Sequence, residues 1–178
     1  MTAEEVYESV TNGGTSDFAA AVAIFDRFGP GSWCLIGGLA VNCYVEPVYT
    51  VDADFVMVAR EMGKVQAALT AAGFALQTFP HSVNARRSGS KLSLQLTTDA
   101  RYQDFLGRAE RREVLGLRVP VATLDDVVQG KVWAWQDEER RLTKRKKDEL
   151  DLLRLGEAYS HLSAVLPPEI VRQLETKS

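Results

Sequence analysis

Residues 50–56 read Thr-Val-Asp-Ala-Asp-Phe-Val, and this stretch decides both the fold and the chemistry of the chain. Asp52 and Asp54 are two residues apart in a β-rich segment, so in a strand both carboxylates point to the same face. Burying two like charges side by side is costly, because each raises the pKa of the other and both resist desolvation. A divalent cation removes that cost, and hard oxygen ligands suit Mg²⁺ or Mn²⁺. The alternative is an edge strand that exposes both aspartates to water.

A glycine pair precedes this stretch at the end of a short apolar run. Residues 33–36 form that run between glycines and predict a buried strand. Gly37 and Gly38 follow it and open a short helix that continues through 40–44. Bare glycine amides can approach a phosphate closely at such a turn. The same turn also occurs with no ligand at all.

Apolar periodicity and turn residues predict the remaining elements. Helices are expected at 19–25 (capped by Ser16-Asp17), 61–72, 124–137 and 144–159, with a short one after Pro168, strands at 74–79 and 92–97, and a hairpin at 113–121. A basic loop, 84–91, is expected between the two strands. Helices, then strands with interspersed helices, then a helical tail indicate an α/β or α+β protein with a mixed sheet.

Composition and length set the class of protein. With 178 residues, the chain fits a single domain, with N-terminal helices in 1–32, a sheet core in 33–122 and C-terminal helices in 123–178. An apolar share of 46% excludes wholesale disorder, and no apolar run approaches the ~20 residues of a membrane span. The acidic N-terminus lacks the pattern of a secretory signal, and Cys34 and Cys43 are too few for a disulfide framework. We therefore expect a cytoplasmic, reduced protein.

Four segments resemble the nucleotidyltransferase superfamily in family order. Residues 35–42 and 50–56 are similar to its glycine pair, short helix and T-x-D-x-D strand. Residues 121–131 resemble the segment in which a helix after the sheet carries a lysine. Residues 144–152 resemble a later R-x-K-D-x-x-D-L helix motif. The set is most similar to the bacterial minimal nucleotidyltransferases represented by the toxin of the AbiE system.

The resemblance implies a fold, a reaction and a set of residues. The fold is a nucleotidyltransferase-like mixed sheet flanked by helices, with a C-terminal helical tail. The reaction is Mg²⁺-dependent (or Mn²⁺-dependent) transfer of a nucleotidyl group from an NTP to an acceptor. The implied partners are an RNA or tRNA acceptor and a cognate antitoxin, in a toxin–antitoxin or phage-defence setting. The implied catalytic residues are Asp52, Asp54, Lys131 and Asp148, with Asp52 and Asp54 as metal ligands and Gly37, Gly38, Thr50 and Lys131 at the nucleotide.

Two further residues of the C-terminal helices have alternative roles. Asp151 lies three residues after Asp148 and so on the same helix face, where it caps the helix or pairs with Arg154. Lys131, without the resemblance, is a solvated helix lysine.

Two positions depart from the family pattern. Val48 stands two residues before Thr50, where the family usually has an arginine. Gln95 stands where a third strand carboxylate is common, and Asp99 follows just beyond it. Both departures favour an alternative function, that of a catalytically lapsed nucleotidyltransferase-fold protein that binds a nucleotide or a partner. A third hypothesis is a plain α/β interaction protein in which Asp52 and Asp54 are merely exposed.

Two basic segments leave a nucleic-acid partner open despite the net charge of −3. Arg86, Arg87 and Lys91 lie in the expected loop, within reach of a triphosphate or an RNA backbone. The denser run at 140–147 could face a tRNA acceptor. For the loop, charge on a solvated hairpin is the default interpretation, and for the run at 140–147 a solvated helix fits equally well.

Overall fold

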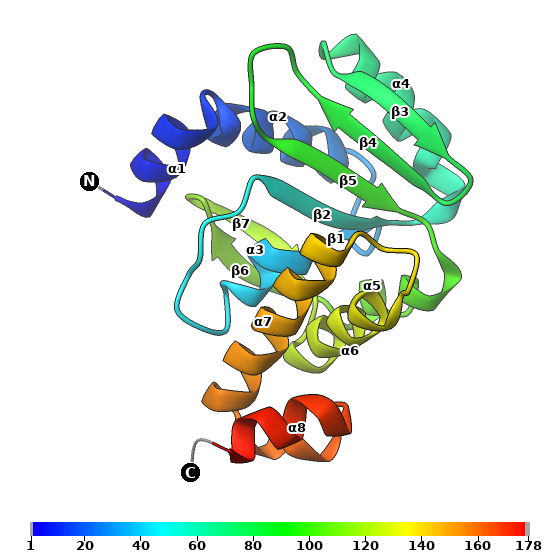
Figure 1. Cartoon of the computed structure of the whole chain (residues 1–178). Coiled ribbons are helices and arrows are strands. Elements are labelled where there is room, and N and C mark those ends of the chain that lie inside the picture. Colours follow the sequence, from blue (N-terminus) through cyan, green and yellow to red (C-terminus); the bar gives the residue numbers. More distant parts are fainter. Residues whose placement is uncertain (1, 177–178) are drawn as a thin grey trace.

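The short apolar run at 33–36 is strand β1 (Trp33–Ile36), and it lies inside a seven-stranded sheet of order β3-β4-β5-β2-β1-β7-β6. Figure 1 shows this sheet in the computed structural model, which describes residues 2–176. The other strands are β2 (Asp52–Met57), β3 (Ala75–Phe79), β4 (Ser82–Arg86), β5 (Ser93–Thr97), β6 (Glu110–Val114) and β7 (Leu117–Val121). β1 pairs antiparallel with β2 and parallel with β7, while β2 pairs parallel with β5. The predicted mixed sheet is confirmed.

Helices pack against the sheet and against one another (Figure 1). They are α1 (Ala3–Thr11), α2 (Gly14–Asp26), α3 (Gly37–Val41), α4 (Met62–Ala71), α5 (Phe105–Arg108), α6 (Leu124–Gln136), α7 (Leu142–Ala158) and α8 (Pro168–Glu175), with 3-10 turns η1 (Ala59–Glu61), η2 (Ala100–Tyr102) and η3 (Ser160–Ala164). α2 contacts α1 and α4, whereas α7 contacts α3, α6 and α8. In the described part of the chain, no helix combines the length and the apolar character that crossing a membrane requires.

Strand β2 separates an aromatic core from a polar face. Phe55 is fully buried, and its ring centroid lies 5.0 Å from that of Phe25 and 6.1 Å from that of Phe18, both on α2. Since successive side chains of a strand point to opposite faces, Asp52 and Asp54 point away from α2. They face the side of the sheet on which α3, α6 and α7 lie.

The expected loop at 84–91 was wrong in its first part. Residues 82–86 form β4, which pairs antiparallel with both β3 and β5. Its side chains alternate regularly, but only two of them, Val83 and Ala85, are apolar and buried, so the sequence signal for the strand is weak. β3 lies at the edge of the sheet and is largely exposed on both faces.

The predicted start of the helix at 19–25 was also wrong. α2 begins at Gly14 rather than after Ser16-Asp17, and the Gly14 N–H donates to Thr11 Oγ1 at 2.9 Å. Thr11 is fully buried between α1 and α2, so its hydroxyl replaces the expected cap.

Asp17, expected in that cap, is buried and bonded to Arg87. The guanidinium lies 3.1 Å from Asp17 Oδ1, donates to the Ala72 carbonyl at 2.8 Å, and stands 4.6 Å from the centroid of the Phe74 ring. One arginine thus ties α2 to the C-terminal end of α4 and to the start of β3. It occupies a structural position and not the surface position expected of the basic loop.

Replacing Arg87 with Met should lower the free energy of unfolding by roughly 2 kcal/mol, because Asp17 would stay buried without its cation. Urea unfolding monitored by circular dichroism measures the change. Arg86→Met is the matched control: Arg86 is exposed, and its replacement should leave the unfolding midpoint within experimental error. Equal effects of the two substitutions would contradict the structural role of Arg87.

Candidate active site

The turn from β1 into α3 is built around the Asp54 carboxylate. Gly37 has φ +70°, and a Cβ placed on it would lie 2.1 Å from Asp54 Oδ2. Ile36 and Asp54 are direct partners in the antiparallel pair, which fixes this approach. Gly38 differs, since a Cβ there would meet Thr50 Oγ1 at 3.6 Å, an ordinary contact. Position 37 therefore requires glycine both for its backbone and for the neighbouring carboxylate.

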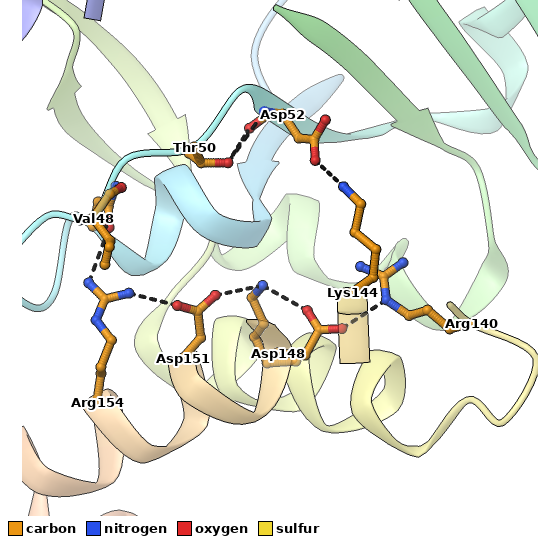
Figure 2. Close-up of polar contacts among 10 residues, drawn as sticks. Val48, Thr50, Asp52, Arg140, Lys144, Asp148, Asp151 and Arg154 are labelled. Carbon is orange, nitrogen blue, oxygen red and sulfur yellow. Dashed lines mark hydrogen bonds and ion pairs between the residues drawn. The ribbon is translucent and has the colours of Figure 1, made fainter. Parts of the chain in front are cut away.

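Asp52 is held by a cation from a distant part of the chain. Lys144 Nζ, at the start of α7, forms an ion pair and hydrogen bond with Asp52 Oδ2 (Figure 2). The lysine side chain is 31% exposed, so the contact lies at the mouth of the site. At the other side of the residue, the Asp52 N–H donates to Thr50 Oγ1 at 3.3 Å. Thr50 therefore fixes the backbone that carries the first carboxylate.

Asp54 is the less compensated of the two carboxylates. Within residues 2–176 its side chain makes no hydrogen bond or close ion pair of the kind that Asp52 makes. Burial, together with the charge of Asp52, raises its pKa from 3.8 to about 6, against the opposing effect of Lys131, Arg140 and Lys144. The site thus contains a carboxylate whose charged form is poorly stabilised in the free protein.

A buried ion-pair network joins α6 to α7 beneath this pair. Lys131 Nζ on α6 lies 3.0 Å from Asp148 Oδ1 and 2.8 Å from Asp151 Oδ2, both on α7. Burial lowers the pKa of the Lys131 ammonium, but Asp151 and Asp148 more than offset this and hold that pKa above its ordinary value. Lys131 is therefore a charged, doubly paired group, and not the solvated helix lysine of the alternative interpretation.

Two arginines close the ends of the network (Figure 2). Arg140 Nε lies 2.8 Å from Asp148 Oδ2, and an Arg154 NH group lies 2.6 Å from Asp151 Oδ1. Asp151 pairs with Arg154 as the spacing predicted, and through Lys131 it also belongs to the same network as Asp148.

The carboxylates and cations line one continuous cleft with two hollows. The larger hollow, about 360 Å³, and the smaller, about 150 Å³, share five lining residues, Asp54, Gln95, Lys131, Arg140 and Asp148. The larger one extends past Asn84 and Tyr102, and the smaller one past Thr50, Asp52 and Lys144. Asp52 and Asp54 line the cleft from the sheet, while α6 and α7 contribute both lysines and the aspartates that pair with them. All the predicted site residues line it: Gly37, Gly38, Thr50, Asp52, Asp54, Lys131 and Asp148.

Asp52 and Asp54 fit a divalent cation that shares its ligands with a substrate. Among the described residues, no three His, Cys, Asp or Glu side chains gather closely enough to hold a metal by themselves. Gln95 pairs in register with Asp54, and Asp99 lies beyond the strand, 2.9 Å from Arg101. Mg²⁺ is commonly bound by one or two carboxylates and completes its shell with water and phosphate oxygens. Two adjacent carboxylates, one of them uncompensated, suit this mode of binding.

Sequence reasoning missed the contact of Lys144 with Asp52. The two residues are 92 positions apart, and Lys144 was noted only as part of a basic run. Arg140, from the same run, contacts Asp148. The dense positive charge at 140–147 was the available signal, and only the fold shows that its partners are the carboxylates of Asp52 and Asp148.

Comparisons with known proteins support the fold. No protein-family description matches the sequence, and no curated protein matches it significantly. The solution structure of the antibiotic-resistance factor ANT(2'')-Ia matches with a TM-score of 0.60 and 13% identity, over 94% of this chain and 91% of that one. The crystal structure of ANT(2'')-Ia in complex with adenylyl-2''-tobramycin matches with a TM-score of 0.56 and 15% identity, over 92% of this chain and 95% of that one. The crystal structure of the lincosamide adenylyltransferase LnuA with bound lincomycin matches with a TM-score of 0.50 and 12% identity, over 71% of this chain and 87% of that one.

These similarities confirm the predicted nucleotidyltransferase-like fold, a mixed sheet flanked by helices. The narrower likeness to the AbiE-system toxin stays a prediction.

Gly37→Ala should lower the free energy of unfolding by about 2–4 kcal/mol, because it places a side chain at positive φ and against Asp54. Gly38→Ala, in ordinary contact with Thr50, should cost less than about 1 kcal/mol. Thermal and urea unfolding of the pair measure the difference. Equal stability of the two variants would show that the turn does not close on the carboxylate.

Asp54 should make the stability of the metal-free protein depend on pH. The pKa of Asp54 is raised to about 6 in the folded protein. The stability that the protonated side chain contributes is therefore fully present below the pKa of Asp54 in the unfolded chain, and it is lost as pH rises through 6. Asp54→Asn removes the ionisation, so its stability relative to the original chain should rise between about pH 4 and pH 8, by up to about 3 kcal/mol. Urea unfolding in EDTA measures this. Asp125→Asn, at an exposed carboxylate outside the cleft, is the control variant.

Proposed function

We propose that this chain transfers a nucleotidyl group from a nucleoside triphosphate to an acceptor hydroxyl, with a divalent cation bound by Asp52 and Asp54. The observation that carries the proposal is the buried Asp54 carboxylate, which has no paired side chain within residues 2–176, beside Asp52 in a cleft that Lys131, Arg140 and Lys144 also line. Such an arrangement costs free energy in the free protein, and a bound cation and polyanion would offset that cost.

The larger hollow suits the nucleoside part of the triphosphate. Its volume of about 360 Å³ is within the range of small-ligand pockets. Asn84, Thr97 and the ring of Tyr102 line it and offer hydrogen-bonding groups and an aromatic edge. Gly37 and Arg140 line the same hollow, so the phosphates would extend toward the glycine turn and the Arg140 guanidinium.

The reaction forms one bond and breaks one. The acceptor oxygen bonds to the α-phosphorus, the bond from that phosphorus to the bridging α–β oxygen breaks, and pyrophosphate leaves with the bonding electrons while the hydroxyl proton passes to solvent. The cation, when bound, neutralises phosphate charge and orients the phosphate oxygens. The chain holds the reactants in place and supplies positive charge around the leaving pyrophosphate.

Lys144 is the cation best placed to exchange partners. It has a single carboxylate partner and a partly exposed side chain, so it can move from Asp52 to a phosphate when a metal binds there. Lys131 is bonded to two buried carboxylates and would have to give up one of them to contact a phosphate. We therefore assign the first phosphate contact to Lys144, and the predicted contact of Lys131 would follow rearrangement of its network.

Two classes of acceptor are compatible with the cleft. The similar structures carry adenylyl-2''-tobramycin and lincomycin, which supports adenylyl transfer to a small hydroxyl compound. The basic run at 140–147 supports the RNA or tRNA acceptor, with a cognate antitoxin as the further partner.

A second candidate function is nucleotide binding without transfer. Gln95 stands beside Asp54 in the sheet, where a third carboxylate would strengthen metal binding. A neutral amide offers one carbonyl ligand and no charge.

Incubation with labelled NTP and Mg²⁺, with either total tRNA or hydroxyl compounds such as tobramycin and lincomycin, tests transfer. We expect Asp52→Asn and Asp54→Asn each to reduce labelling at least about a hundredfold, because each removes a cation ligand. Asp125→Asn, exposed on α6, should label as the original chain does.

Calorimetry with Mg·NTP separates the remaining outcomes. Binding that is lost in Asp54→Asn, without labelling of any acceptor, would favour the nucleotide-binding alternative. If neither binding nor labelling occurs, the proposed function is wrong.

A further inference from the structure

Gln95 lies where the two hollows of the cleft meet. It is one of the five residues that line both hollows, and the other four, Asp54, Lys131, Arg140 and Asp148, are charged. Asp148 is bonded to both Lys131 and Arg140, while Asp54 is a ligand for the cation in the proposed function. Gln95 therefore provides the neutral side chain at this junction.

The Gln95 carboxamide is free to bond a ligand. The residue is half-buried, and within residues 2–176 its side chain makes no hydrogen bond. A carboxamide offers two N–H donors and a carbonyl acceptor, so it is complementary to neutral groups that both donate and accept, such as hydroxyls. It can bond such a group without giving up a partner in the chain.

The sheet fixes the position of this amide relative to Asp54. Gln95 on β5 is the direct partner of Asp54 on β2 and of Asn84 on β4. Direct partners point to the same face of a sheet, and neighbouring strands lie about 4.8 Å apart. The three side chains thus form a row that lines the larger hollow. A phosphate held by a cation at Asp54 has Gln95 as the next group along this row.

The parts of a nucleotide follow one another in a fixed order of phosphates, sugar and base. In the proposed function the phosphates lie at the cation and Lys144, and the nucleoside lies in the larger hollow. The part that spans the junction between the hollows is then the sugar, which is neutral and carries hydroxyl groups. Of the five junction side chains, the Gln95 amide matches a sugar hydroxyl in charge and in hydrogen-bonding capacity.

We propose that Gln95 hydrogen-bonds a ribose hydroxyl and makes the site selective for ribonucleoside triphosphates over their deoxy counterparts. The inference rests on the proposed function, because it requires a nucleotide whose phosphates lie at the cation. A deoxynucleotide covers the amide without bonding it, and leaving a polar group covered and unpaired lowers affinity. Asn84, one strand further from Asp54, lies beyond the sugar and contacts neither hydroxyl.

Calorimetry of the full chain with Mg·ATP, Mg·2′-deoxy-ATP and Mg·3′-deoxy-ATP, without an acceptor, tests this selectivity. We expect Mg·ATP to bind about tenfold more tightly than at least one of the two deoxynucleotides. The compound that binds more weakly identifies the hydroxyl. Equal affinity for all three nucleotides would overturn the inference.

Gln95→Met removes the amide and keeps an unbranched side chain of similar length. It should weaken Mg·ATP binding about tenfold and change the affinity of the weaker deoxynucleotide by less than about twofold, so the preference is lost. Asn84→Leu, in the same row, is the matched control and should change all three affinities by the same factor. If Gln95→Met folds poorly, Gln95→Asn withdraws the amide by one methylene and should also lose the preference. A preference that survives in the folded Gln95 variant would contradict the ribose contact.

Two further measurements separate the ribose contact from a cation ligand and from the transfer reaction. Mn²⁺ titration followed by electron paramagnetic resonance, without nucleotide, should give the same affinity for Gln95→Met as for the original chain. Weaker Mn²⁺ binding by the variant would assign the amide to the cation and overturn the ribose contact. Acceptor labelling that is equal with ATP and both deoxynucleotides would overturn this inference and leave transfer intact, whereas failure of every Mg·NTP to bind would overturn the proposed function itself.

Discussion

Asp52 and Asp54 repel each other across one face of β2, and the structure answers that repulsion with cations from elsewhere in the chain. Lys144 contacts the first carboxylate, while Lys131 and Arg140 act on the second at longer range. Lys131 and Arg140 are in turn paired with Asp148 and Asp151, so α6 and α7 are oriented by charge as well as by apolar packing. The position of the C-terminal helices thus depends in part on the negative charge of Asp52 and Asp54 in strand β2.

The sequence predicted this centre because its signals are local. Two aspartates at strand spacing, an apolar strand before them and a glycine turn are all visible within about twenty residues. The features that the sequence could not predict are contacts between residues that are far apart along the chain and close in space. Strand β4 has only two apolar residues, Val83 and Ala85, too few to mark a strand, and only its pairing with two neighbours reveals it. The contact of Lys144 with Asp52 and the burial of Arg87 against Asp17 likewise join residues that no spacing rule connects.

Similarity to known structures at 12–15% identity indicates how few positions this fold specifies tightly. Gly37 illustrates such a position, since its backbone angle and the carboxylate beside it both exclude a side chain. Most core positions require only an apolar side chain of suitable volume. A chain can therefore retain the architecture after its sequence has diverged beyond detection by family comparison.

Asn42 bonds the backbone of Val48 in both directions: its amide donates to the Val48 carbonyl at 2.8 Å, and its side-chain oxygen accepts from the Val48 N–H at 3.0 Å. The loop before β2 therefore takes its form from an asparagine and from the main chain of residue 48, whose own side chain is 44% exposed. Shape and chemistry are decoupled at this position. Evolution, or a designer, can therefore exchange the side chain of residue 48, which lines the smaller hollow, without reshaping the loop.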